Sequence, residues 1–177
     1  MKKITLWALS AMTMLAGCSA SEVSSLVEEV QASDLISGAV YKISPYFDET
    51  RSMFVRNASF DEGTEIVAWT DTKVNAQRWR LTKDPTGVYF YLTNVYTGKS
   101  VHIQSPVSLG ARLRQYGIEN DYTYKWTITK AEQAGSDCYY ISPSSLASGE
   151  RLYLEIGDGE DGTNIQSYIC LLYTSDA

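Results

Sequence analysis

The sequence has few of the residues on which most catalytic and metal sites depend. It contains one histidine, His102, and three cysteines among 177 residues. It has no Gly-x-Ser-x-Gly nucleophile elbow, no His-Glu-x-x-His pair and no phosphate-binding P-loop. The sequence therefore predicts a protein that is not an enzyme and that holds no cofactor and no metal.

Positive charge is also scarce. The chain has 15 Lys and Arg against 21 Asp and Glu, which gives a formal net charge of −6. A protein with this charge does not attract the phosphate backbone of nucleic acids, so no nucleic-acid partner is predicted. Arg112 and Arg114 alternate along one expected strand, a pattern more typical of solvent-facing positions than of a polyanion site.

Long apolar runs are absent after the first 17 residues. The early run from Ile4 to Leu15 follows two lysines and is too short to span a bilayer, so residues 1–17 are predicted to be a secretory signal peptide. Leu15-Ala16-Gly17-Cys18 resembles the bacterial lipobox, which implies cleavage before Cys18 and attachment of lipid to that residue.

The segment after the cleavage position is polar and rich in serine. Residues 18–38 are predicted to be a lipidated tether that holds the protein on a membrane of the cell envelope. Ser19, rather than Asp, follows the cysteine, and by resemblance to bacterial sorting rules this favours the outer membrane. Cys138 is interpreted as a packed thiol, and its pairing with Cys170 is left open.

The main feature of the body is a motif that occurs three times and begins each time with a glycine. The three glycines lie 47 and 52 residues apart along the chain. An apolar residue follows each glycine after three positions, and an aromatic residue follows after three more. The three sets are Gly63, Ile66 and Trp69; Gly110, Leu113 and Tyr116; and Gly162, Ile165 and Tyr168.

Short apolar alternations separated by Gly, Pro, Asn and Asp predict many brief strands and no long helix. With four strands in each copy they favour a closed all-β fold with threefold pseudosymmetry. The acidic cluster from Gly157 to Gly162 is interpreted as a hairpin turn rather than a calcium loop. The expected strands are 40–44, 52–56, 64–69, 78–82, 88–93, 100–104, 111–116, 125–129, 138–142, 151–155 and 164–169.

Two further motifs occur within these copies. An apolar-x-apolar triplet occurs as Met53-Phe54-Val55, Val101-His102-Ile103 and Leu152-Tyr153-Leu154, and Gln77-Arg78-Trp79 forms a Gln-x-Trp motif. Together with the glycine repeat they resemble the ricin B-type β-trefoil lectins over residues 39–169. The resemblance implies a β-trefoil of three pseudo-symmetric four-strand repeats, a carbohydrate-binding function and a glycan or polysaccharide partner.

The end of the chain departs from this pattern. By spacing, the tryptophan that closes the third copy would stand at position 178, one past the last residue. Residues 170–177 match nothing in the other copies and look like the translation of a sequencing adapter, so they are predicted to be a non-native tail. The last strand is therefore expected to be missing or replaced by the tail.

The resemblance also implies which residues contact sugar. In these lectins an Asp on the second strand, a Gln and an aromatic residue on the third strand, and an amide pair before the final Trp hold the ligand. Aligned in this way, the Asp position holds Phe54, His102 and Tyr153, so no copy has the carboxylate. The candidate carbohydrate-binding residues are Trp69, Gln77, His102, Arg114, Tyr116, Gln166 and Tyr168.

Several alternatives stay open at this point. His102, Arg114 and Tyr116 suit a different, acidic glycan in the second copy. Trp79 and Trp126 are expected in the core rather than in a site. A non-lectin β-trefoil for protein interaction or scaffolding and an accessory module of a truncated glycoside hydrolase are the other functions considered. The sequence does not identify the sugar or the oligomeric state.

Overall fold

The computed structural model describes residues 2–6, 35–46, 48–104, 106–131, 138–144, 152–156 and 160–169. The side chains of residues 2–6, 155–156 and 166–169 are outside this description. Cys18, most of the predicted tether and the tail from 170 to 177 are also outside it.

The described residues form twelve strands and three short 3₁₀ helices, and they contain no α-helix. The 3₁₀ helices are η1 (Arg56–Ala58), η2 (Asn75–Gln77) and η3 (Tyr122–Tyr124). The strands are β1 (Lys2–Leu6), β2 (Val40–Pro45), β3 (Arg51–Val55), β4 (Ile66–Thr70), β5 (Trp79–Lys83), β6 (Phe90–Asn94), β7 (Ser100–His102), β8 (Arg114–Tyr116), β9 (Trp126–Lys130), β10 (Cys138–Pro143), β11 (Leu152–Ile156) and β12 (Ile165–Ile169).

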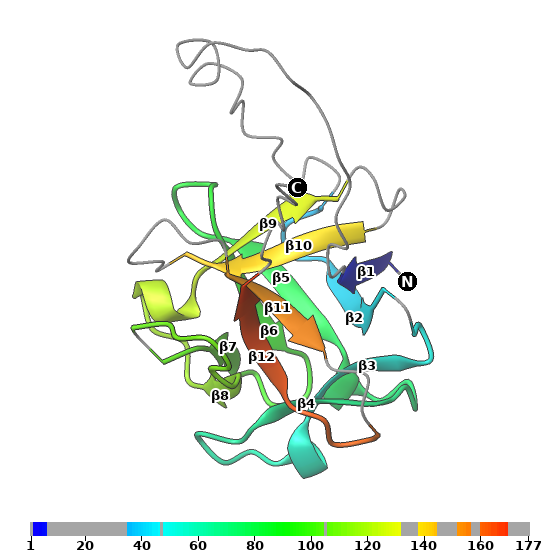
Figure 1. Ribbon diagram of the computed structural model, residues 1–177. Coiled ribbons are helices and arrows are strands. Elements are labelled where there is room, and N and C mark those ends of the chain that lie inside the picture. Colours follow the sequence, from blue (N-terminus) through cyan, green and yellow to red (C-terminus); the bar gives the residue numbers. More distant parts are fainter. Residues whose placement is uncertain are drawn as a thin grey trace, which may run out of the picture.

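The strands repeat one arrangement along the chain (Figure 1). The last strand of the first copy, β5, pairs antiparallel with β2 and β6, and the last strand of the second copy, β9, pairs antiparallel with β6 and β10. The middle strands of the copies form the hairpins β3–β4, β7–β8 and β11–β12. This confirms the predicted all-β trefoil, and a strand lies at each of the eleven predicted places.

The position between β2 and β10 is the exception to the symmetry. By analogy with β5 and β9, the last strand of the third copy would lie there and run antiparallel to both neighbours. The structure places β1 in that position, parallel to β2 and to β10. Cleavage before Cys18, as predicted, would remove β1 and leave two strand edges unpaired, and such edges favour pairing with another chain.

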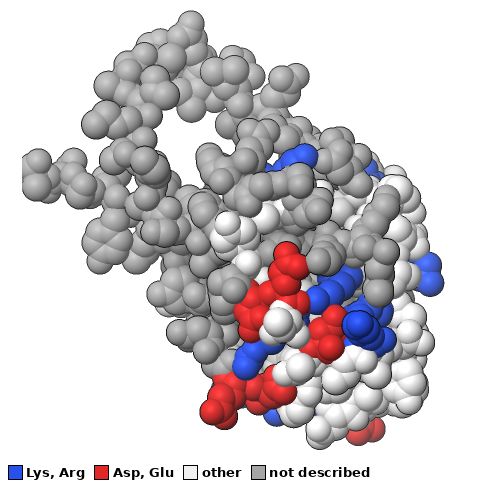
Figure 2. Space-filling view, turned by 90° about the vertical axis from the view of Figure 1, so that its right-hand side faces the viewer, with Lys and Arg blue, Asp and Glu red and all other residues white. Residues whose placement is uncertain are grey.

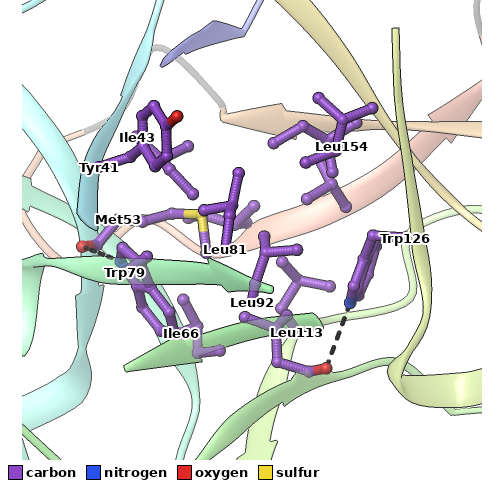
Figure 3. Close-up of a cluster of buried hydrophobic side chains, with 14 of the residues drawn as sticks. Tyr41, Ile43, Met53, Ile66, Trp79, Leu81, Leu92, Leu113, Trp126 and Leu154 are labelled. Atoms are coloured by element: carbon purple, nitrogen blue, oxygen red, sulfur yellow. Dashed lines mark hydrogen bonds between the residues drawn. The ribbon is translucent and has the colours of Figure 1, made fainter. Parts of the chain in front are cut away.

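The core lies inside this ring of strands and is built around two tryptophans (Figure 3). Trp79 and Trp126 both have an exposed fraction of 0%. The indole Nε1–H of Trp79 donates to the Met53 carbonyl at 3.1 Å, and that of Trp126 donates to the Val101 carbonyl at 3.3 Å. The prediction that both belong to the core is confirmed, and each ties the end of its copy to the second strand of the same copy.

Replacing either tryptophan with phenylalanine tests this role. Trp79→Phe and Trp126→Phe each leave a buried carbonyl unpaired and a small cavity, so we expect each to lower the free energy of unfolding by about 1–3 kcal/mol. Urea denaturation followed by circular dichroism measures the change. Val74→Ala, at an exposed position, is the control and should change it little. Equal effects of all three substitutions would contradict the role of the indole bonds.

Removing β1 tests how much that strand contributes to closure. A chain that begins at Ser19 lacks β1, so we expect a melting temperature lower by about 5 °C or more and association that increases with concentration. Differential scanning calorimetry and light scattering measure these two properties. A shortened chain that has the same melting temperature as the full chain and stays monomeric would show that β1 does not stabilise the barrel.

Candidate functional site

The three middle hairpins lie against one another and fix one another through backbone hydrogen bonds. The Ile66 N–H donates to the Leu113 carbonyl at 3.0 Å, and the Leu113 N–H donates to the Ile165 carbonyl at 3.1 Å. These three residues are the apolar members of the sequence repeat, and all three are buried. The repeat therefore exists because each copy must supply the same contact to its neighbour.

Two of the three turn glycines of the repeat, Gly63 and Gly162, lie beside an aromatic residue of another copy, whereas an added Cβ at Gly110 would meet no atom within 4 Å. A Cβ at Gly63 would lie 3.1 Å from the phenolic oxygen of Tyr116, and one at Gly162 would lie 3.7 Å from the Trp69 ring. Both glycines have positive φ, +76° and +95°, which side chains disfavour. The glycines therefore set how closely a hairpin approaches the aromatic ring beside it.

The hairpin β7–β8 places three of the candidate residues together. His102 lies directly opposite Arg114, and Tyr116 follows two positions later on the same outward face. The imidazole of His102 lies between two rings, 4.9 Å from the centroid of Tyr116 and 4.9 Å from that of Tyr124. Tyr116 is partly exposed, so one of its faces is accessible to a ligand.

A hollow of about 820 Å³ lies beside this hairpin. Among the described residues that line it, two carry a positive charge and none is acidic. The lining residues are His102, Gln104, Pro106, Ser108, Gly110, Ala111, Arg112, Arg114 and Tyr116. Three of the sequence candidates therefore meet in one concave site, with Arg112 as an additional member.

The surroundings of the histidine in this hollow favour its neutral form. Partial burial lowers the pKa of His102 below its ordinary value, and the negative charges of Asp121 and Glu119 oppose that shift. A neutral imidazole has one nitrogen that donates and one that accepts a hydrogen bond. His102 can therefore bind a hydroxyl in either direction, while the positive charge of the hollow comes from the arginines.

The first copy has a different surface. Trp69 is partly exposed and its ring packs against Phe54, with centroids 5.8 Å apart. Gln77 is fully buried; its Oε1 accepts from the Thr72 N–H at 2.9 Å, and its Nε2 donates to the Thr70 carbonyl at 2.8 Å. The structure therefore places Gln77 beneath the surface, where it shapes the loop between β4 and β5, and only Trp69 of the two candidates reaches solvent.

The register of the third hairpin corrects the alignment made from sequence. Ile165 pairs with Ile156, as Ile66 pairs with Val55, and so Glu155 faces Gln166 where Phe54 faces Val67. The residue that corresponds to Phe54 and His102 is thus Glu155 and not Tyr153, and the third copy does carry a carboxylate.

This misalignment had a physical cause. Residues 152–156 alternate between apolar and other residues, so the apolar-x-apolar triplet can be aligned with residues 152–154 or with residues 154–156. The connection between β11 and β12 is shorter than in the other two hairpins, and the observed register is that of residues 154–156. The Leu154-Glu155-Ile156 triplet was the signal that was missed. The side chains of Glu155, Gln166 and Tyr168 lie outside the described residues, and only their register positions are used below.

Within the described ranges, no cluster of three or more His, Cys, Asp or Glu residues is arranged to hold a metal ion. The same ranges contain no helix of sufficient length and apolarity to cross a bilayer. Cys138 is a buried thiol, as predicted.

The comparisons with known proteins agree with this geometry. Residues 37–116 match the family model described as ricin-type beta-trefoil lectin domain-like. No curated protein is similar enough to count as a match. Three solved structures illustrate the similarity of the fold.

The first is a designed threefold-symmetric protein, ThreeFoil, with 25% identity over 67% of this chain and 81% of its own, and a TM-score of 0.58. The second is an exo-beta-1,3-galactanase from Clostridium thermocellum, with 28% identity, 69% and 28% coverage, and a TM-score of 0.57. The third is a ricin B-like lectin from Macrolepiota procera in complex with lactose, with 17% identity, 76% and 88% coverage, and a TM-score of 0.53.

Substituting Gly63 tests the contact between the turn and the ring. Gly63→Ala adds a strained positive φ and a methyl group 3.1 Å from the Tyr116 hydroxyl, so we expect a loss of about 1–3 kcal/mol of unfolding free energy. Urea denaturation measures it. Gly98→Ala is the matched control, since Gly98 has φ +69° but no atom within 4 Å of an added Cβ.

The difference between the two glycine variants isolates the contact with Tyr116. Adding Tyr116→Phe to Gly63→Ala removes the clashing hydroxyl and should recover part of the loss. Equal losses for Gly63→Ala and Gly98→Ala, with no recovery in the double variant, would show that the ring is not held by this turn.

Proposed function

We propose that this protein binds carbohydrate without catalysing a reaction, and that it does so on the surface of a bacterial membrane. The observation that carries the proposal is the hollow beside β7–β8, where the partly exposed ring of Tyr116 lies next to His102 and Arg114. An aromatic face stacks on the apolar side of a sugar ring, and polar side chains beside it bind the hydroxyl groups.

The third hairpin supports the same function. Its register sets Glu155 opposite Gln166, and Tyr168 follows two positions later along β12. A carboxylate, an amide and an aromatic residue on neighbouring strands are the groups that the resemblance to ricin B-type lectins assigns to sugar binding. The match of residues 37–116 to the lectin-like family covers the first two hairpins and not the third, and with the lactose bound by the Macrolepiota procera lectin it supports sugar binding by this fold.

The proposed location rests on the sequence alone. The apolar run and the Leu15-Ala16-Gly17-Cys18 motif support a lipid on Cys18, with the outer membrane favoured by Ser19. Several acyl chains on one residue suffice for stable anchoring without a spanning helix. The absence of catalysis is proposed from the single, partly buried histidine and the lack of the common nucleophile and metal motifs.

A second candidate function is that of an accessory module in a glycoside hydrolase. The observation that favours it is the similarity to the Clostridium thermocellum galactanase, of which this chain spans 28%. In that case the trefoil would still bind sugar and would direct a separate catalytic part to it. The sequence of the gene beyond the codon for Ile169 distinguishes the two candidates.

Removing the three outward aromatic residues tests the proposed function. A Trp69→Ala, Tyr116→Ala, Tyr168→Ala variant loses the stacking surface of all three hairpins, so we expect saccharide affinity to fall about tenfold or more, equivalent to about 1.4 kcal/mol. A glycan array followed by isothermal titration calorimetry measures it. Tyr96→Ala, at an exposed tyrosine that does not line the hollow, is the control.

Two results would count against sugar binding. One is a folded wild-type protein that binds no saccharide on the array at millimolar concentration. The other is a triple variant that keeps the wild-type affinity, which would place the ligand elsewhere and favour a protein-contact role. A melting curve for each variant ensures that a loss of binding is not a loss of fold.

A further inference from the structure

The hollow beside β7–β8 has a charge that is opposite to that of the whole protein. The chain carries a formal net charge of −6, yet the described lining of the hollow contains Arg112 and Arg114 and no carboxylate. A concave site lined by one sign of charge attracts ligands of the other sign. The local charge therefore indicates a ligand that is not neutral.

Arg114 has no neutralising partner among the described residues. Its Nη1 donates only to the Gly63 carbonyl, at 3.4 Å, and no described carboxylate lies within ion-pair distance. Arg112 has a partner that it shares, because Glu65 binds Arg112 at 3.1 Å and Arg56 at 3.2 Å. One carboxylate between two guanidinium groups leaves a net positive charge, and the Arg112 side chain is 54% exposed.

Several other cationic groups among the described residues have carboxylate partners. Arg78 and Lys42 bind Asp71 at 3.0 and 3.2 Å, and Arg51 binds Asp48. Figure 2 shows a face of the molecule on the side of β2 and β3, where acidic and basic side chains adjoin one another. On that face acidic and basic groups pair, whereas in the hollow Arg114 has no described carboxylate within ion-pair distance and Arg112 shares one carboxylate with Arg56.

Three acidic residues near the hollow, Glu62, Glu119 and Asp121, do not line it. Glu119 and Asp121 act on the pKa of His102, but neither lines the hollow. The Asp121 carboxylate accepts from the Thr123 N–H. Glu62 accepts from the Gly117 N–H at 2.9 Å and pairs with Lys99. Two of these three carboxylates therefore bind the chain itself.

The positions of Arg114 and Tyr116 match one substituted sugar ring. Both project from the same face of β8, two residues apart, which corresponds to roughly 7 Å along a strand. A pyranose stacked on Tyr116 would extend an exocyclic substituent to Arg114. A planar guanidinium binds a carboxylate or a sulfate through two parallel hydrogen bonds, so such a substituent would be recognised by geometry as well as by charge.

We propose that the hollow beside β7–β8 selects an acidic saccharide, with Tyr116 stacked on the sugar ring and Arg114, assisted by Arg112, bound to its carboxylate or sulfate. This inference rests on the proposed carbohydrate-binding function and adds the ligand class of one of its sites. It distinguishes this hairpin from the third, where Glu155 stands at the register position of His102.

The test compares acidic saccharides with neutral counterparts. The array carries uronate oligosaccharides beside their methyl esters, sialylated glycans beside asialo forms, and sulfated glycans beside desulfated ones, so that carboxylate and sulfate are distinguished. We expect the wild-type protein to prefer the acidic member of one series by about three- to tenfold, as for a partly exposed charge-assisted hydrogen bond. The preference should shrink as salt is raised from about 50 to about 500 mM, because the Debye length then falls about threefold.

Arg114→Gln should lower the affinity for the acidic member more than the affinity for the neutral member, and so abolish the preference. Arg80→Gln is the matched control, because Arg80 is an exposed strand arginine that also donates to a glycine carbonyl, that of Gly38 at 2.7 Å, and does not line the hollow. Tyr116→Ala should weaken both members of the preferred pair. Melting curves confirm that each variant is folded.

The outcomes separate this inference from the proposed function. Equal binding of acidic and neutral members, unaffected by Arg114→Gln, overturns the acidic preference and leaves sugar binding in place. Binding of acidic glycans that Tyr116→Ala does not change, together with equal binding of polyglutamate, overturns the sugar contact and shows a general anion site. No binding of any saccharide overturns both.

Discussion

A backbone hydrogen bond from a turn glycine to a neighbouring hairpin, made by Gly63 and by Gly162, is the contact on which the site depends. The Gly63 N–H donates to the Gln115 carbonyl and the Gly162 N–H donates to the Ala68 carbonyl, both at 2.9 Å. Each acceptor is the residue just before an outward aromatic, Tyr116 or Trp69. A hairpin of one copy therefore fixes the position of the ring in another copy, and a single hairpin could not hold its ring in the same way.

Barrel closure imposes a second constraint, which the three copies meet unequally. In the first two copies a tryptophan begins the last strand and bonds to a carbonyl of the second strand. The third copy has no such tryptophan, and β1 takes the place of its last strand in the opposite direction. A trefoil whose copies share one core tolerates this, because Leu154 and Ile165 still supply the third copy's part of that core.

Features that the repeat constrains could be predicted from the sequence. The register of a strand could not be predicted where only the alternation of apolar and other residues marks it. Each copy must reproduce the same contacts, so the spacing of the residues that make them is visible without a structure. These residues are the turn glycines, the buried Ile66, Leu113 and Ile165, and the core tryptophans. The position of Glu155 was not predicted, because an alternation with a period of two residues fits two registers that differ by two residues equally well. The burial of Gln77 was also invisible, since its partners are backbone groups of the loop between β4 and β5.

Alternation along a strand explains how one scaffold can carry three different sites. Inward positions such as Val101 and Leu113 are fully buried and must stay apolar. Outward positions have no such requirement. One outward position is held by Phe54, His102 and Glu155 in the three copies, and these residues lie beside Trp69, Arg114 and Gln166 respectively. The charge of the outward residue then decides which ligand a hairpin accepts. A hairpin with Arg114 and one with Glu155 can belong to the same fold and still favour opposite charges on the sugar.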